Sequence, residues 1–377
     1  MRKEIIVLGD IEMGAGTITD DFISDKALCR LIDSLNKKKI VVDLILNGDT
    51  FDFIKCPILV NNQIVYPRHI SPDISLKKMN LIIEAHSRVF ISLKAFASHK
   101  KNNLYFIFGN HDLDLIFPII QKELKNVLES KENVFFGMTY QQHSVYIEHG
   151  QQYDIFNRIN LRRLFVKYHG KRILNLPWSF GALNKFMNIK EAHPFLERIT
   201  PRLSLLSYYK PLEKKITLAA IKYFIASIFY YPFRYYSDPT YSFPSGIFGQ
   251  LFRGLMGLRW EIDTIIDIFK KKKKRLLKRN KIVVLGHIHT TYVEEKKYYV
   301  LFHPGSWRDE YKLDVQNGKV TSKPKNYIHI TVRDDKLSWD LEPITINRKT
   351  LDMRKIIEDE KEFIKKAAEE EGYYFRR

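Results

Sequence analysis

Short apolar runs alternate with longer amphipathic stretches in the first part of the chain. Three runs rich in β-branched or aromatic residues end in Gly or Asn-Gly, at Glu4–Leu8, Val41–Leu46 and Leu104–Phe108. This pattern is typical of buried strands. Between the runs, Asp21–Lys38 and Ser75–His99 carry apolar residues three and four positions apart, which predicts two helices packed on a sheet.

Similar runs return further along the chain. They predict strands at Asn133–Gly137, Ser144–Glu148, Lys281–Leu285 and Tyr298–Phe302, and a hairpin of Tyr327–Val332 with Leu337–Leu341. The stretch Thr350–Glu371 is charged at helical spacing and has a modest apolar stripe. It predicts a helix docked on the rest of the fold.

Residues 155–280 differ in composition and in hydrophobic pattern. They hold about 23 of the 50 aromatic residues, mixed with Arg and Lys, and strand alternation is nearly absent. Prolines interrupt the segment repeatedly, which predicts a helical insertion broken at those points. Its last helix is expected to begin near Arg259 and to end in the solvated run Lys270–Arg275.

The positive charge is concentrated in the same segment. The chain has a formal net charge of +19, and residues 155–280 contain about 25 Lys and Arg against about 7 Asp and Glu. An excess of this size is typical of proteins that bind nucleic acid or an anionic membrane. Its location assigns that property to the insertion, because the remainder of the chain is close to neutral.

The cysteines and the N-terminus suggest a compartment. Cys29 and Cys56 form no CxxC pair, which fits a reducing environment. The first ten residues, MRKEIIVLGD, lack the apolar region of a signal peptide and read as a core strand. We expect a cytoplasmic protein, with peripheral attachment to the inner face of the membrane as an open alternative.

Polar segments follow five of the predicted strands. They are GDIE at Gly9–Glu12, NGDTFD at Asn47–Asp52, GNHD at Gly109–Asp112, EHG at Glu148–Gly150 and GHIH at Gly286–His289. Open α/β folds build their sites at such strand ends. The side chains that could hold two divalent cations there are Asp10, Glu12, Asp49, Asn110, His149, His287 and His289.

Two adjacent cations suit the hydrolysis of phosphate esters. They lower the pKa of a bridging water and offset the charge that develops on the phosphoryl oxygens. Such a pair needs a bridging carboxylate, and Asp49 at the end of the second strand suits that role.

The ordered series DxE, GDxxD, GNHD, HG and GHxH resembles the calcineurin-like metallophosphoesterase family, over residues 1–154 and 281–345. The resemblance implies an α/β fold, a four-layer α/β/β/α sandwich of two mixed sheets, here with an inserted basic helical cap. It also implies that Asp10, Glu12, Asp49 and His289 surround one cation, and Asp49, Asn110, His149 and His287 the other. His111 would protonate the leaving oxygen or stabilise the transition state, with Asp52 and Asp112 orienting ligands or His111.

The first motif departs from the family pattern. Asp-x-His is usual there, whereas this chain has Asp10-Ile11-Glu12. Glutamate is a hard oxygen donor, so we expect Mn²⁺, with Mg²⁺, Fe²⁺ or Zn²⁺ as alternatives and softer Zn²⁺ disfavoured. An impaired first site is the other interpretation.

Some features are similar to one branch of the family, which contains UDP-2,3-diacylglucosamine pyrophosphohydrolases. They are HGQQYD at His149–Asp154, the long insertion after it, Asp20-Asp21-Phe22 and Gly305-Ser306-Trp307. In that branch a helical cap holds acyl chains above the cations. The resemblance implies a phosphoester substrate with a lipid or hydrophobic part.

The insertion leaves several interpretations open. Its most apolar stretch, Ile216–Phe233, suits an interfacial helix on anionic lipid or a cap for acyl chains, and packing within the insertion is the simpler alternative. Its length and Lys222 disfavour a transmembrane helix. Basic and aromatic residues also suit single-stranded nucleic acid, but repair nucleases of this family carry their extra domain after the core.

We therefore expect metal-dependent hydrolysis of a phosphomonoester, phosphodiester or pyrophosphate bond by a metal-bridging hydroxide, on a lipid-linked or hydrophobic substrate. A nuclease or nucleotide phosphodiesterase is the alternative, and a non-catalytic membrane-associated binding protein with a decayed metal site is the second. The expected domains are the core at 1–154 and 281–347, the cap at 155–280 and a C-terminal helix at 348–377. The sequence does not indicate the oligomeric state.

Overall fold

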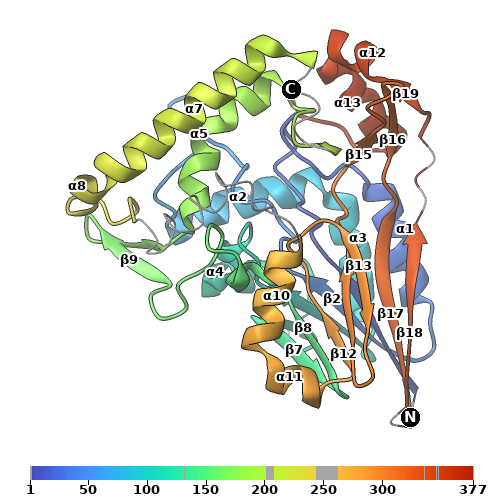
Figure 1. The fold of residues 1–377 in the computed structure, drawn as a ribbon. Helices are drawn as coiled ribbons and strands as arrows, with labels where there is room; N and C mark the ends of the chain where they lie inside the picture. The colour runs from blue at the N-terminus through green and yellow to red at the C-terminus, as the bar shows by residue number, and fades with distance from the viewer. Residues whose placement is uncertain are drawn as a thin grey trace.

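The fold, seen in a computed structural model, contains two β-sheets that face each other (Figure 1). The structure describes residues 2–130, 132–200, 208–242, 262–334, 336–344, 346 and 348–376. The predicted start of a helix near Arg259 lies outside these residues.

The first sheet holds the N-terminal strands. Its order is β18 (Lys336–Ile344), β17 (Lys325–Arg333), β1 (Arg2–Leu8), β2 (Val41–Asn47), β5 (Asn102–Ile107) and β6 (Val134–Gly137). Strands β1, β2, β5 and β6 are parallel, and the β17–β18 hairpin adds antiparallel strands beside β1. The predicted hairpin is thus confirmed, and the parallel strands all end at one edge.

The second sheet combines strands from both sides of the insertion. Its order is β13 (Thr291–Glu295), β14 (Val300–Pro304), β12 (Ile282–Val284), β8 (Val145–Glu148) and β7 (Thr139–Gln142). Strand β12 is parallel to both β8 and β14. The facing sides of the two sheets share a buried apolar core that includes Ile5, Val7, Ile45, Ile147, Val284 and Phe302.

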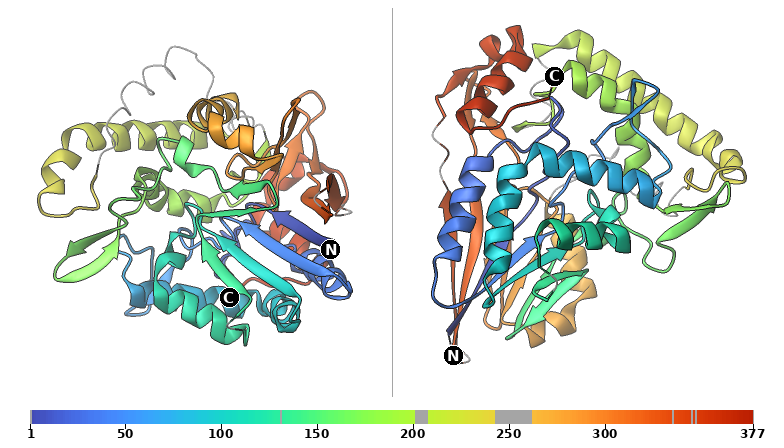
Figure 2. Two further views of the ribbon diagram at one scale, coloured as in Figure 1. Left: turned by 90° about the horizontal axis from the view of Figure 1, so that it is seen from below. Right: turned by 180° about the vertical axis from the view of Figure 1, so that it is seen from behind.

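Helices cover the outer face of each sheet (Figure 2). The first sheet is covered by α1 (Asp25–Asn36), α2 (Pro72–Ala85), α3 (Ser87–Ser98) and α4 (Pro118–Val127). The second is covered by α10 (Ile262–Lys272) and α11 (Lys274–Arg279), through Phe269 and Leu277. These layers confirm the predicted α/β/β/α sandwich. Short 3-10 turns, η1 (Leu113–Ile116) and η2 (Gln151–Tyr153), follow two of the polar segments.

Two predicted helices are divided in the structure. The stretch Ser75–His99 forms α2 and α3 because His86 leaves helical geometry, with φ −110° and ψ 33°, and its Nδ1 lies 2.8 Å from Asp25 Oδ1. The stretch Thr350–Glu371 forms β19 (Leu351–Asp352), α12 (Met353–Glu358) and α13 (Glu360–Glu370). The Asp359 side chain accepts a hydrogen bond from Glu362 N and begins the last helix.

The segment 155–280 contains a hairpin that its sequence did not predict. Strands β9 (Phe165–Tyr168) and β10 (Lys171–Leu174) are joined by His169 and Gly170, both with positive φ, as a two-residue turn of this kind requires. The helices there are α5 (Trp178–Ala192), α7 (Lys210–Phe229) and α8 (Tyr231–Tyr235), besides α10 and α11. The segment is thus less uniformly helical than its composition indicated.

A small sheet joins three parts of the chain. Its order is β11 (Ile199–Thr200), β15 (Tyr311–Leu313), β16 (Lys319–Ser322) and β19. The pairing of β11 with β15 fixes the insertion to the segment after the last motif. A separate hairpin of β3 (Ile58–Val60) and β4 (Gln63–Val65) follows the second motif. Among the described residues, no helix is both long and apolar enough to cross a membrane.

Candidate metal centre

The five polar segments meet where the two sheets end. Backbone hydrogen bonds connect them: Gly286 N donates to His149 O at 2.7 Å, and Glu12 N donates to Asp49 O at 2.8 Å. The carboxyl ends of parallel strands lie at a common edge, so the topology places these segments together. Residues as far apart in the sequence as Asp10 and His289 thereby share one site.

Five of the predicted ligand residues have left-handed backbone geometry. Their φ angles are 50° at Asp10, 57° at Glu12, 47° at Asp49, 79° at His287 and 58° at His289. This region is costly for side chains with a Cβ atom and persists where the surrounding structure imposes it. The sharp turns aim the side chains back across the strand ends.

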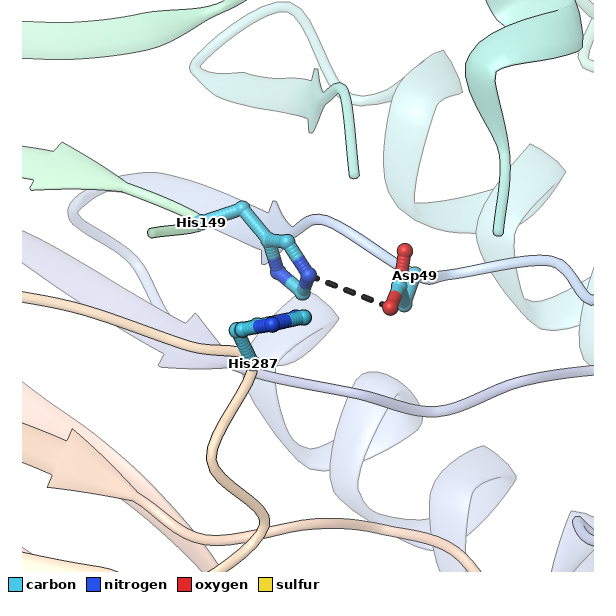
Figure 3. A group of neighbouring side chains, drawn as sticks. All are labelled: Asp49, His149 and His287. Atoms are coloured by element: carbon cyan, nitrogen blue, oxygen red, sulfur yellow. Dashed lines mark ion pairs between the residues drawn. The ribbon is translucent and has the colours of Figure 1, made fainter. Parts of the chain in front are cut away.

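Asp49, His149 and His287 form one of two groups of side chains among the described residues that could hold a cation (Figure 3). Each offers one donor atom, and these atoms lie within 4.8 Å of one another. His149 Nε2 is 3.1 Å from Asp49 Oδ2, while its Nδ1 lies 2.9 Å from Asn47 O. His287 Nε2 is 3.0 Å from Asp154 Oδ2. Each histidine thus has an oxygen acceptor for one ring nitrogen, as metal-binding histidines usually do.

Three buried donor atoms on this side have no hydrogen-bond partner among the described residues. They are Asp49 Oδ2, Asn110 Oδ1 and His149 Nε2. Buried polar atoms are normally paired, and a divalent cation would give such oxygen and nitrogen donors a partner. Carboxylate, amide and imidazole donors suit several divalent metals, so the set fits a cation without selecting one. We call Asp49, Asn110, His149 and His287 the Asn110 side of the site.

Glycines make room for these ligands. A Cβ atom on Gly109 would lie 2.0 Å from Asp49 Oδ1, and one on Gly48 would lie 2.4 Å from the His149 ring. Gly48 also has a φ of 74°. The Gly residues of two motifs are therefore required by the close approach of backbone to ligand.

Asp10, Glu12 and His289 form the other half, which we call the Glu12 side. His289 Nε2 lies 3.4 Å from Asp10 Oδ1 and 3.6 Å from Glu12 Oε1. Both Asp10 carboxylate oxygens also accept from His287 N at 3.1 Å. All three side chains are near one another, as the sequence predicted for the first cation.

Glu12 also contacts two positively charged side chains. Its Oε2 lies 2.8 Å from Lys55 Nζ, and its Oε1 lies 3.3 Å from Arg308 Nη1. Burial opposes ionisation of Glu12, but Arg308 and Lys55 outweigh it and hold the pKa of this carboxyl well below its usual range. The Glu12 side is therefore already supplied with positive charge.

His111 lies beside the site and is held by carboxylates. Its Nδ1 lies 3.1 Å from Asp52 Oδ1, and its backbone N–H donates to Asp49 Oδ1 at 2.7 Å. Glu12, Asp52 and His111 each bring a donor atom within 4.8 Å of the others. Burial disfavours the imidazolium, yet Glu12, Asp52 and Asp49 raise the pKa of His111 to about 9.

Asp112 connects two of the motifs. Its carboxylate accepts from Gly109 N at 2.6 Å and from Thr50 N at 2.8 Å, so it ties the loop of Asn110 to that of Asp49. Burial, and then the charge of Asp49, raise the pKa of Asp112 to about 7. Of the two carboxylates expected to orient ligands or His111, Asp112 contacts the backbone of two ligand loops and Asp52 contacts His111.

Several neighbours of the site were not predicted from sequence as site residues. Asp154 holds His287, and Lys55 and Arg308 hold Glu12. Asp21 accepts from Lys55 and Arg308 at 2.5 and 2.9 Å. Each lies within a few residues of a quoted motif, in HGQQYD, NGDTFDFIK, GSWR and DDF, which is the signal that could have identified them.

Two solved structures are similar in part. One is a conserved uncharacterized protein from Streptococcus pneumoniae TIGR4, a predicted phosphoesterase, with 9% identity, a TM-score of 0.29, and coverage of 91% of this chain and 90% of that one. The other is a proposed 5'-nucleotidase from Staphylococcus aureus, in complex with alpha-ketoglutarate. It has 13% identity and a TM-score of 0.33, and the match covers 98% of this chain and 58% of that one. At these TM-scores neither structure establishes a shared fold.

The family comparison is more informative. A search of curated proteins found no match to this sequence. The family model described as calcineurin-like phosphoesterase matches residues 3–194, just over half of the chain. That range contains four of the five motifs and ends before GHIH. The chain therefore belongs to the calcineurin-like phosphoesterase family and is a metallophosphoesterase, a hydrolase of phosphoric esters.

Proposed function

We propose that this protein hydrolyses a phosphomonoester, phosphodiester or pyrophosphate bond in a substrate with a lipid or other hydrophobic part. The observation that carries the proposal is the group of buried donors on the Asn110 side, in which Asp49, His149 and His287 bring donor atoms within 4.8 Å of one another beside His111. A divalent cation held there, Mn²⁺ in our proposal, would polarise a phosphoryl oxygen and activate water. On the Glu12 side, Asp10 and His289 would serve a second cation.

The proposed role of His111 is proton donation to the leaving oxygen. Asp52 holds Nδ1 of this imidazole, so Nε2 is the nitrogen that would face the substrate. The surrounding carboxylates raise the pKa of His111 to about 9, which favours the protonated ring that a general acid requires. Asp112 would keep the Asp49 and Asn110 loops at a fixed separation.

A basic and aromatic pocket supports an anionic, amphipathic substrate. It has a volume of about 550 Å³ and is lined by Arg158, Arg162, Arg163, Trp178 and Tyr235, among others. Its lining includes Gln152 and Ile155, which lie on either side of the His287 partner Asp154 in the sequence. Guanidinium groups recognise phosphate oxygens, and the aromatic rings offer an apolar wall.

One face of α7 supports contact with lipid. Leu218, Ile221, Ile225 and Phe229 recur at helical spacing and are 47%, 49%, 50% and 68% exposed. Exposed lysines of the same helix, Lys214, Lys215 and Lys222, flank this face. An apolar face bordered by lysines is typical of helices that lie on anionic membranes. A substrate like that of the UDP-2,3-diacylglucosamine branch agrees with this arrangement.

The test is hydrolysis by purified protein of a panel of phospholipids, nucleotide-sugar lipids, nucleotides, single-stranded oligonucleotides and an aryl phosphate, with Mn²⁺. We expect turnover of a lipid-linked substrate and its loss in Asp49→Ala, while circular dichroism shows a folded variant. Preferred cleavage of oligonucleotides would favour the nuclease alternative. No hydrolysis anywhere on the panel would contradict the proposal and favour a non-catalytic binding protein.

A further inference from the structure

The Glu12 side contains an internal ion cluster. Lys55 Nζ lies 2.8 Å from Glu12 Oε2, and Arg308 Nη1 lies 3.3 Å from Glu12 Oε1. The side chains of Glu12, Lys55 and Arg308 are 0%, 2% and 5% exposed. Each oxygen of the Glu12 carboxylate thus has its own cationic partner, shielded from water.

Further carboxylates hold the charged groups of Lys55 and Arg308 in place. Lys55 Nζ is 2.5 Å from Asp21 Oδ2 and 2.7 Å from Asp52 Oδ2. Arg308 Nη2 is 2.9 Å from the same Asp21 oxygen, and Lys190 of α5 lies 2.7 Å from it. If Lys55 or Arg308 moved away from Glu12, it would also give up its ion pairs with other buried carboxylates, Asp21 among them, which is costly.

The Asn110 side has the opposite character. Among the described residues, Asn110 Oδ1 is buried without a hydrogen-bond partner, and Asp49 Oδ2 and His149 Nε2 face each other at 3.1 Å. Among the described residues, no Lys or Arg lies within ion-pair distance of Asp49, whose charged neighbours are the His149 and His111 imidazoles. A cation that enters this side meets open donors, whereas one that enters the Glu12 side meets two fixed positive charges.

We propose that the two cation positions are unequal, with the Asn110 side binding a divalent cation at least about tenfold more tightly than the Glu12 side. The physical reason is that Lys55 and Arg308 already neutralise Glu12 and repel a second cation. This inference rests on the metal-dependent hydrolysis proposed above. Position 12 is then an anchor for an ion cluster more than it is a metal ligand.

The direct test is a Mn²⁺ titration of the metal-free full chain, followed by calorimetry and by equilibrium dialysis with elemental analysis. We expect one tight binding step, and a second that is at least tenfold weaker. Electron paramagnetic resonance at one equivalent should show isolated Mn²⁺ and no spin-coupled pair. Two steps of equal affinity in the wild type would overturn the inference.

Removing one positively charged side chain of the cluster should change only the second, weaker Mn²⁺ binding step. In Lys55→Met we expect the second step to tighten by about tenfold or more and the first to stay unchanged. Lys78→Met is the matched control, because Lys78 is equally buried but its Nζ bonds Phe53 O and is not paired with Glu12. Arg308→Leu should act in the same direction as Lys55→Met and replaces it if Lys55→Met does not fold.

The outcomes separate this inference from the proposed function. An unchanged second step in a folded Lys55→Met or Arg308→Leu protein would contradict the inference. Hydrolysis together with two equal sites would contradict the inference and leave the function standing. Unequal sites without hydrolysis of any substrate would contradict the proposed function and leave the inference standing.

Discussion

His287 Nε2 lies 3.0 Å from Asp154 Oδ2, so the carboxylate at the end of HGQQYD fixes the imidazole that opens GHIH. Asp154 is itself held, because its oxygens accept from Phe156 N at 2.9 Å and from Asn157 Nδ2 at 2.6 Å. The start of the insertion therefore determines how a predicted ligand on the other side of it is oriented.

Replacing Asp154 should weaken cation binding without unfolding the protein. Outer partners of metal-binding histidines typically contribute about 10- to 100-fold in affinity, and we expect a loss of that size in Asp154→Ala. The measurement is Mn²⁺ titration of metal-free protein. Asp340→Ala, at an exposed position of β18, is the control. Equal affinities in both variants would contradict an orienting role.

His111→Asn should lower kcat and leave cation binding intact. General acids contribute about 10²- to 10⁴-fold, and we expect a loss in that range with a leaving group that needs protonation. An activated aryl phosphate should be affected less, because its leaving group needs no proton. His143→Asn is the control, since His143 is exposed in the β7–β8 turn with a φ of 50°, which Asn tolerates. Equal losses with both substrates would exclude proton donation.

Gly109→Ala should displace Asp49 from the site. The new methyl group would lie 2.0 Å from Asp49 Oδ1, so either the carboxylate or the loop must move. We expect loss of tight Mn²⁺ binding and of hydrolysis. Gly137→Ala is the matched control, because its methyl group would approach no nearer than 3.7 Å and Gly137 lies on the adjacent strand β6. A Gly109→Ala protein that binds Mn²⁺ normally would contradict this prediction, because the loop would then have moved to accommodate the methyl group.

Lys325 should make stability depend on pH. Its Nζ is buried without a hydrogen-bond partner among the described residues, and burial lowers the pKa of Lys325 to about 8, although Asp309 acts in the other direction. The unfolded state then binds more protons than the folded state between about pH 8 and about pH 10.4, so the free energy of unfolding rises with pH in that window.

The measurement is urea denaturation at pH values near both ends of this window. The rise attributable to Lys325 should be on the order of 2 kcal/mol, and Lys325→Met should lack it. Lys312→Met, at an exposed position of β15, should keep it. Parallel pH profiles of wild type and Lys325→Met would contradict a depressed pKa at Lys325.

The α7 face should bind anionic membranes. Ile225→Glu should reduce co-sedimentation with phosphatidylserine-containing vesicles by about tenfold or more, because burying a large aliphatic side chain contributes about 1.5–3 kcal/mol. Ile91→Glu is the control, since Ile91 is 66% exposed on α3, a helix that covers the first sheet. Equal loss in both variants, or no binding by the wild type, would exclude this surface as a lipid contact.

Much of the core was predictable because its strands are buried on both faces. Apolar runs such as Glu4–Leu8 and Lys281–Leu285 have few alternatives to a central strand, and each directs a polar segment to the sheet edge. The grouping of Asp49, His149 and His287 follows from parallel strands that end together. Their binding of a cation stays a prediction.

The rest depends on contacts that local patterns do not encode. His86, where the predicted helix divides, contacts Asp25 from 61 positions away, and the Glu12 ion pair needs Arg308, which lies 296 positions away. The β9–β10 hairpin depends on a two-residue turn inside a segment whose composition indicated helices. Tertiary packing decides these features, and a single sequence does not display it.

The pairing of Ile199 in β11 with Tyr311 in β15 bears on how a substrate could enter. Beside β11, Arg198 is buried and bonds Asp309 at 2.9 Å, while α10 and α11 pack on the second sheet at the far end of the same segment. These contacts oppose movement of the whole insertion away from the two sheets. Admission would then be controlled by fluctuation of the parts between them, such as α7 and α8, and the rate of product release would report on those helices.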